Sequence, residues 1–317
     1  MSRAVAPLLA ICVAVLAGMA LPVRAATPEG PRIAVLAEGF DAEAGRDIIT
    51  MGPNGESPQG MISEAGWSGP SWSADGSLLA FGSFGEWKGE VAAVAEAAGP
   101  SIRFFRRAPL VSDRPVMAPD GRTVAFEYKY AVWLLNVKSG SVRRLRADFE
   151  PSSFSPDGSK LAGTIGFVPA EAVAVDLRTG HVSLLAREAS EPVYSPDGSE
   201  VAFIRWKNWR SNGVDDGSQP IDELRVTRVG TFPRSRLVRR SHKLLAWPSW
   251  DPSGQRIAFI RTRVVENGYD DPMQGDALMA INADGTCLKK VYSDPETTLY
   301  AAAWRPGPGR EAGPIPC

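Results

Sequence analysis

The chain has 317 residues, 44% of them hydrophobic, which is enough to bury a substantial core. Its 35 Lys and Arg residues nearly balance its 36 Asp and Glu residues, leaving a formal net charge of -1. This balance argues against nucleic acids or anionic membranes as the main partner, because proteins that bind them chiefly through net charge are strongly basic.

The first 25 residues have the organisation of a secretory signal peptide. Arg3 precedes a mainly apolar run from Ala4 to Leu21, and the segment ends in Val23-Arg24-Ala25. We expect cleavage after Ala25, which would place the mature protein in the periplasm, at the cell surface or in the medium, with no membrane span left. The alternative is a retained anchor, because about 18–20 apolar residues can cross a bilayer.

The first strand is expected over Arg32–Leu36, and from residue 72 onwards a short phrase recurs about every 40–55 residues. A large side chain is followed by a tight turn and then by a short apolar strand. The copies are Trp72–Gly76, Met117–Gly121, Phe154–Gly158, Tyr194–Gly198 and Trp250–Gly254, with a degenerate sixth copy at Trp304–Gly307. A strand-based repeat of this length predicts a radial array of sheets, a β-propeller.

The chemistry of the phrase explains its turn. In Ser-Pro-Asp-Gly, Pro fixes φ at the second position of the turn, Asp is favoured at the third, and Gly fits the fourth without steric strain. The recurring large residues are interpreted as core, with a ligand cage as the minor alternative. The recurring aspartates are interpreted as turn residues rather than as a ring of carboxylates: Asp75, Asp120, Asp157 and Asp197.

Two further strands follow each turn, for example Val132–Asn136 and then a basic outer segment around Arg143 and Arg144. Positive side chains on an outer strand are typical of protection against edge-to-edge pairing, and a basic binding belt is the alternative. At the end of the chain, Tyr300–Trp304 looks like an inner strand with no blade after it. Pairing with Arg32–Leu36 would complete one blade and close the ring.

The sequence therefore predicts an all-β fold, a six-bladed β-propeller closed by pairing of N-terminal and C-terminal strands in one blade. The propeller is expected over residues 31–307, followed by a C-terminal tail over 308–317. No change of composition marks a second domain.

The repeated phrase resembles the TolB-type propeller repeat, a WD-like repeat. Phe154–Gly158 and Tyr194–Gly198 match it best, and Asn282-Ala283-Asp284-Gly285 is similar to that family's turn between the third and fourth strands. The resemblance covers residues 31–307 and implies a six-bladed propeller. It also implies an extracytoplasmic protein that binds partner proteins of the envelope. No segment here corresponds to the α/β domain that precedes the propeller in TolB itself.

Cys287 and Cys317 are the cysteines outside the signal segment. In an oxidising compartment an even pair is a disulfide candidate, and this one would tie the C-terminal tail to the last blade. The alternative is two unpaired thiols.

Catalytic motifs are absent from the sequence. There is no Gly-x-Ser-x-Gly elbow, and the two histidines, His181 and His242, have no recognisable partners for metal binding or nucleophilic catalysis. A non-enzymatic binding protein is therefore favoured, without a cofactor. A hydrolase or lyase with its site at the mouth of the central channel remains the alternative.

Long connections between the second and third strands interrupt the fifth and sixth blades. Equivalent connections lie on the same face of a propeller, and long loops on a rigid scaffold often carry function, although they can also be solvated excursions. Tryptophan, tyrosine and arginine dominate interface energetics. The predicted partner-binding residues are Trp206, Trp209, Arg210, Tyr269, Asp270 and Asp271.

The expected partner is an envelope or extracellular protein, a peptide or a glycan. A lesser alternative for the two insertions is a Ca²⁺ site, if the aspartates of both converge. These aspartates lack the spacing of a known calcium loop. They are Asp215, Asp216, Asp270 and Asp271.

Overall fold

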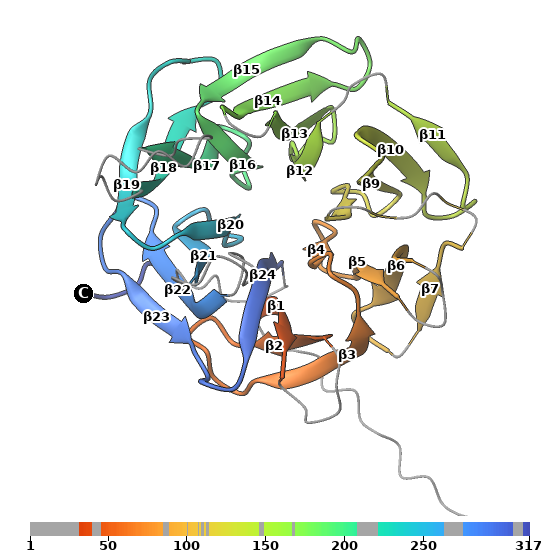
Figure 1. Ribbon diagram of the computed structural model, residues 1–317, viewed down its shortest axis with the longest axis horizontal. Helices are drawn as coiled ribbons and strands as arrows, with labels where there is room; N and C mark the ends of the chain where they lie inside the picture. Colours follow the sequence, from red (N-terminus) through yellow and green to blue (C-terminus); the bar gives the residue numbers. More distant parts are fainter. Residues whose placement is uncertain are drawn as a thin grey trace, which may run out of the picture.

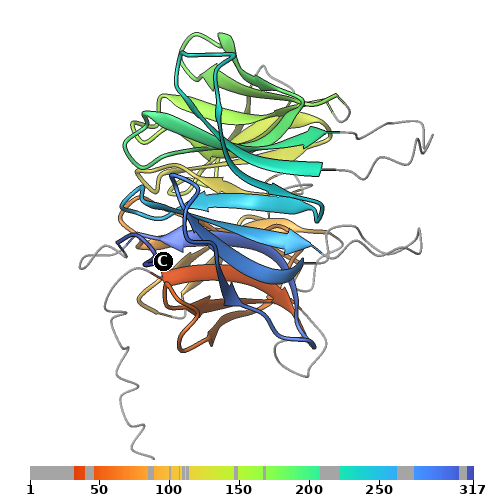
Figure 2. The same cartoon turned by 90° about the vertical axis from the view of Figure 1, so that its left-hand side faces the viewer.

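The computed structural model describes residues 32–39, 46–84, 89–99, 101–106, 108, 111, 114–145, 149–166, 169–207, 221–262, 275–306 and 313–317. The expected signal peptide lies outside these ranges. The described part of the chain forms strands β1 to β24 and contains no helix, and hence none that could span a bilayer. The sheets are arranged radially around a central axis, as in a propeller (Figure 1), and their strands run along that axis (Figure 2).

Three antiparallel sheets have four strands each, in sequence order from the axis outwards. The first contains β8 (Val116–Met117), β9 (Thr123–Tyr128), β10 (Ala131–Asn136) and β11 (Val142–Arg144). The second contains β12 (Glu150–Phe154), β13 (Lys160–Ile165), β14 (Glu171–Asp176) and β15 (Val182–Arg187). The third contains β16 (Ala189–Tyr194), β17 (Glu200–Lys207), β18 (Ile221–Arg228) and β19 (Arg236–Ser241).

The remaining strands form a 12-stranded sheet that divides into three groups. Among the residues that the structure describes, the groups are joined by the single pairs Gly275↔Leu299 and Ala65↔Ser83. One group is β20 (Leu245–Trp250), β21 (Arg256–Thr262), β22 (Gly275–Asn282) and β23 (Lys289–Tyr292). The next is β24 (Thr298–Arg305), β1 (Arg32–Glu38), β2 (Arg46–Met51) and β3 (Gln59–Ala65). The last is β4 (Ser71–Trp72), β5 (Leu78–Ser83), β6 (Val91–Glu96) and β7 (Ile102–Phe104).

The two ends of the chain meet in the middle group. β1 pairs antiparallel with β24, and Ala34 lies opposite Ala303. The apolar residues of β1 from Ile33 to Ala37 are fully buried because the strand has neighbours on both edges and core on both faces.

The repeated phrase has the structure that its residues predict. In five copies the Gly N–H donates to the carbonyl of the residue three positions earlier, and Gly has φ between +66° and +72°. Such values favour glycine because it has no Cβ. The expectation that the large residues are core is confirmed, since each is buried: Trp72, Met117, Phe154, Tyr194, Trp250 and Trp304.

A hydrogen bond between a hydroxyl and a carboxylate supports the turn in four copies. The Ser155 hydroxyl donates to Asp157 at 2.6 Å. In Trp250–Gly254 serine and aspartate have exchanged places, and the Ser253 hydroxyl donates to Asp251, again at 2.6 Å. The exchange preserves the hydroxyl–carboxylate hydrogen bond. The turn itself does not require this bond, because Ala118 replaces the serine in Met117–Gly121 and the Gly121 N–H still donates to the Ala118 carbonyl at 2.9 Å.

The described end of the C-terminal tail is docked on the ring. Cys287 and Cys317 form a disulfide. The side chain of Asn282 binds both backbone groups of Ile315, accepting from its N–H at 2.7 Å and donating to its carbonyl at 3.1 Å. Ile315 is buried in the core cluster that contains β1 and β24.

Candidate binding face

The strand ends that carry the long insertions lie on one side of the ring. In the third four-stranded sheet, β17 ends at Lys207 opposite Ile221 of β18, and Asp222 lies opposite Ser241 at the end of β19. The chain reverses direction between neighbouring antiparallel strands. Because the sheets of a propeller repeat around the axis, equivalent strand ends of all sheets lie on the same face. We call this side the insertion face, and the side that carries the repeated turns the turn face.

The structure describes one of the predicted partner-binding residues. Trp206 lies next to the end of β17, is partly buried, and packs against the core cluster between β16–β19 and β20–β22. The others lie outside the described residues, as do the aspartates considered for Ca²⁺: Trp209, Arg210, Asp215, Asp216, Tyr269, Asp270 and Asp271.

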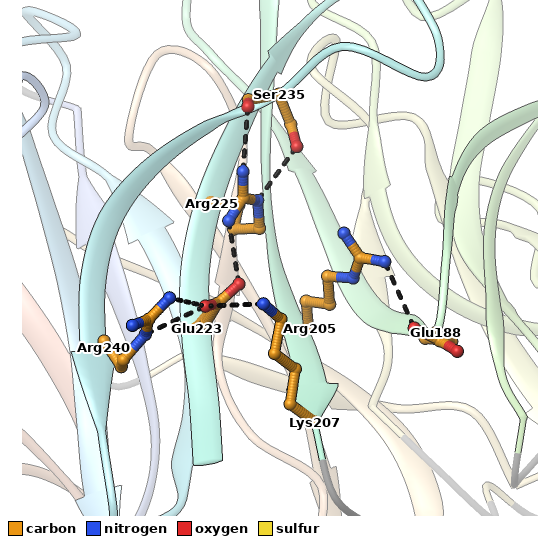
Figure 3. A network of polar contacts seen from close by, with 7 residues as sticks. All are labelled: Glu188, Arg205, Lys207, Glu223, Arg225, Ser235 and Arg240. Carbon is orange, nitrogen blue, oxygen red and sulfur yellow. Dashed lines mark hydrogen bonds and ion pairs between the residues drawn. The ribbon is translucent and has the colours of Figure 1, made fainter.

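A buried glutamate organises the base of the first insertion (Figure 3). The side chain of Glu223 on β18 is 0% exposed, and three cations surround it. Arg240 and Lys207 contact Oε1 at 2.7 and 3.4 Å, and Arg225 contacts Oε2 at 2.8 Å. Arg225 is fixed in turn by Ser235, which accepts at 2.9 Å through both its hydroxyl and its carbonyl oxygen.

The balance of charge around Glu223 explains its titration. Burial alone would raise the pKa of this carboxyl, but the hydrogen bonds from Arg240, Arg225 and Lys207 outweigh it, and the pKa is lowered. The group is therefore ionised at neutral pH and rigidly held. Sequence reasoning missed this network. The available signal was the spacing of Glu223 and Arg225, because residues two apart on a strand share one face.

An aromatic and arginine cluster lies where β24, β1 and β2 end on the insertion face. The guanidinium carbon of Arg46 is 3.0 Å from the ring centroid of Trp67 and 4.4 Å from that of Tyr300. Arg46 also pairs with Glu38 at 3.1 Å, and the Tyr300 hydroxyl donates to Glu38. Burial, then Glu38, raises the pKa of Tyr300, so the phenol stays protonated as a donor.

A second cluster reaches across the axis. The guanidinium carbon of Arg114, just before β8, lies 3.7 Å from the ring centroid of Trp247 on β20. The sheets of β9 and β21 stand on opposite sides of the axis in Figure 1, so this contact spans the channel. The backbone N–H of Trp247 donates to the carboxylate of Glu191 on β16. Both Glu191 and Trp247 have positive φ, 52° and 60°, and both precede proline.

Asp222 lies beside this cluster and has a perturbed titration. It is 2% exposed, and its Oδ2 accepts from Leu245 N–H at 2.8 Å. Its Oδ1 has no hydrogen-bond partner within the described ranges. Burial, with a further contribution from Glu191, raises the pKa of Asp222 to about 7. A shift of this size is found at many functional sites, but a carboxyl this buried is placed to hold β20 rather than to meet a substrate.

No cluster of three or more His, Cys, Asp or Glu side chains suited to a metal ion occurs among the residues described above. The insertion face therefore offers aromatic rings, guanidinium groups and ordered carboxylates. These groups can recognise a partner surface through stacking, charge and hydrogen bonds.

Comparison with known proteins identifies the fold. No protein-family model matches the sequence, and no curated protein does. TolB from Acinetobacter baumannii superposes with a TM-score of 0.68 at 19% identity, over 86% of this chain and 66% of that one. A protein assigned as TolB in Agrobacterium tumefaciens gives 0.59 at 18% identity, over 87% and 98%. The chain thus spans just under two thirds of the Acinetobacter protein. Its fold is that of a TolB-type β-propeller.

Proposed function

We propose that this protein is a six-bladed, non-enzymatic binding propeller that engages a protein, peptide or glycan through the insertion face. The blade count is supported by the three four-stranded sheets and by the three groups of four within the 12-stranded sheet. In this reading the β1–β24 pairing closes the ring. The signal-like segment over residues 1–25 supports a location outside the cytoplasm, in the periplasm, at the cell surface or in the medium.

The observation that carries the proposal is the exposure of aromatic side chains in short connections next to strands on the insertion face. Trp67, which follows β3, is 56% exposed although Arg46 stacks on it, and Tyr130 in the β9–β10 turn is 86% exposed. Aromatic rings supply large contact areas and few rotatable bonds, which makes them frequent anchors of interfaces. Catalysis is less well supported, because Asp222, the carboxyl with a pKa near neutrality, is shielded from solvent.

Site-specific photo-crosslinking in the native host tests this function. A benzoylphenylalanine at position 67 or 130 should give one defined crosslinked species, identified by mass spectrometry. The same probe at Val182, which is 44% exposed on the turn face, serves as the matched control and should not give that species. The triple variant Trp206→Ala, Trp209→Ala and Tyr269→Ala should weaken the crosslink and leave folding intact. An unchanged yield in that variant would rule out these three side chains as anchors, and the same product from position 182 would rule out the insertion face.

A further inference from the structure

The turn face opens into a cavity on the axis of the ring. Its volume is about 330 Å³. Every copy of the repeated phrase contributes its large side chain to the wall: Trp72, Met117, Phe154, Tyr194, Trp250 and Trp304. Turn prolines complete the lining: Pro119, Pro156, Pro196, Pro252 and Pro306. The residues that build the core therefore also form an aromatic, proline-lined chamber, on the face opposite the insertions.

Exposed carboxylates adjoin the lining of this chamber, and we call them the rim. Four lining residues, one in each of four repeated turns, are followed directly by an exposed aspartate: Asp75, Asp120, Asp157 and Asp197. Hydrogen bonds, first from the preceding serine hydroxyls, lower the pKa of Asp75, Asp157 and Asp197, to about 2 for Asp157. These groups are therefore ionised at neutral pH. Within the same turns, residues 73–77, 118–122, 155–159 and 195–199, Arg122 is the only cation.

Two side chains show which chemistry suits the chamber. Tyr194 lines the wall, and its buried hydroxyl has no hydrogen-bond partner in the described part of the chain. It lies close enough to Asp157 for that carboxylate, after burial, to help raise its pKa to about 12. Arg305 supplies an internal precedent, because its guanidinium carbon lies 5.2 Å from the Trp72 ring centroid while its Nε donates to the Gly76 carbonyl at 3.0 Å.

We infer that the chamber receives a lysine or arginine side chain presented by a partner peptide. Aromatic rings attract ammonium and guanidinium groups through their quadrupoles, and the attraction grows when the cation is desolvated. The methylene stem of such a side chain packs on the prolines and on Met117, while its charge faces the ionised rim and the Tyr194 hydroxyl. A neutral side chain gains nothing from the rim. This site is separate from the insertion face, and its test does not depend on the proposed function.

A pair of peptides tests the inference on the native protein. Both are short Gly-Ser sequences, one with a central arginine and the other with citrulline, its neutral near-isostere. Binding is followed through the indole N–H signals of ¹⁵N-labelled Trp72, Trp250 and Trp304. The arginine peptide should shift these signals and bind about tenfold more tightly than the citrulline peptide, the factor expected of a largely desolvated cation–π contact. Equal binding of the two peptides, or no shift with either, would overturn the inference.

A matched pair of variants locates the charge. Asp157→Asn with Asp197→Asn removes two rim carboxylates and keeps the oxygen that accepts from Ser159 and Ser199 N–H. Asp176→Asn with Asp284→Asn makes the same change in outer turns, where the carboxylates accept from Thr179 and Thr286 N–H. The rim variant should weaken the arginine peptide several-fold and leave the citrulline peptide unchanged, whereas the outer variant should change neither. Equal effects of the two variants would place the cation elsewhere.

Discussion

Asp222 and Glu223 are adjacent on β18 and point to opposite sides of the sheet, as consecutive strand residues must. Glu223 meets three cations, so its pKa is lowered in spite of its burial. Asp222 accepts the Leu245 N–H in an environment dominated by desolvation, and its pKa is raised to about 7. One step along the chain thus separates a fixed anion from a carboxyl that titrates near neutrality.

The raised pKa of Asp222 makes stability depend on pH. Because the folded pKa of about 7 exceeds the unfolded value of 3.8, the folded state binds more protons between these limits. The contribution is fully present below about pH 4 and is lost as the pH rises through 7, a change of roughly 4 kcal/mol in the free energy of unfolding. Asp222→Asn keeps an acceptor for Leu245 and cannot ionise. Between pH 4 and pH 8, urea denaturation should therefore show a smaller fall in the free energy of unfolding for this variant than for the native protein. Parallel curves for the two proteins would contradict the assignment.

At the scale of strands and turns, local chemistry was predictable. Short apolar runs such as Val201–Ile204 became fully buried second strands, and Ser-Pro-Asp-Gly gave the expected turn with glycine at positive φ. These features depend on a few consecutive residues, and the same residues recur in several copies of the repeat, which makes the features predictable. The Asp251–Ser253 exchange shows that the sequence pattern tolerates a change that preserves the hydrogen bond.

Contacts between distant strands were not predictable. Arg46 and Tyr300 are 254 positions apart, and their contact follows only from closure of the ladder between β1 and β24. Arg114 reaches Trp247 because their sheets stand across the axis, which no local pattern encodes. A ligand cage of the recurring aromatic residues was only the minor alternative, for a related reason. The burial of each aromatic residue was foreseen, whereas their convergence depends on the diameter of the ring.

The docked tail gives a prediction at this scale. The Cys287–Cys317 disulfide closes a loop with a sequence separation of 30 and holds Ile315 in the core. Cys317→Ser should lower the free energy of unfolding by about 3–4 kcal/mol, the value that loop-closure entropy assigns to a loop of this length. Urea denaturation measures it. Dithiothreitol should destabilise the native protein by a similar amount and leave the variant unaffected. A stabilised variant, or one still sensitive to reductant, would show that the bond does not act in this way.

The whole molecule depends on the ladder that joins its two ends. β1 lies between β24 and β2, and residues near each terminus complete the same core cluster. A propeller ring that is closed in this way has no free sheet edge between its first and last blades. Opening the ladder would expose the edges of β24 and β1, and neighbouring sheets would lose contacts on one side. We therefore expect closure to determine whether the ring unfolds as one unit.

Val35→Pro tests closure directly. Val35 pairs with Ile49 on one side and Ala302 on the other, and proline in a central strand removes a ladder donor and disrupts the pairing. Loss of a closed ring should lower the unfolding temperature markedly and replace one coincident transition, followed by tryptophan fluorescence and far-ultraviolet circular dichroism, with separated ones. Val35→Ala removes two methyl groups from the core but keeps the N–H, so it should lower stability while the transitions stay coincident. If the proline variant also unfolds in one coincident step at nearly the native temperature, the terminal strands do not hold the ring together.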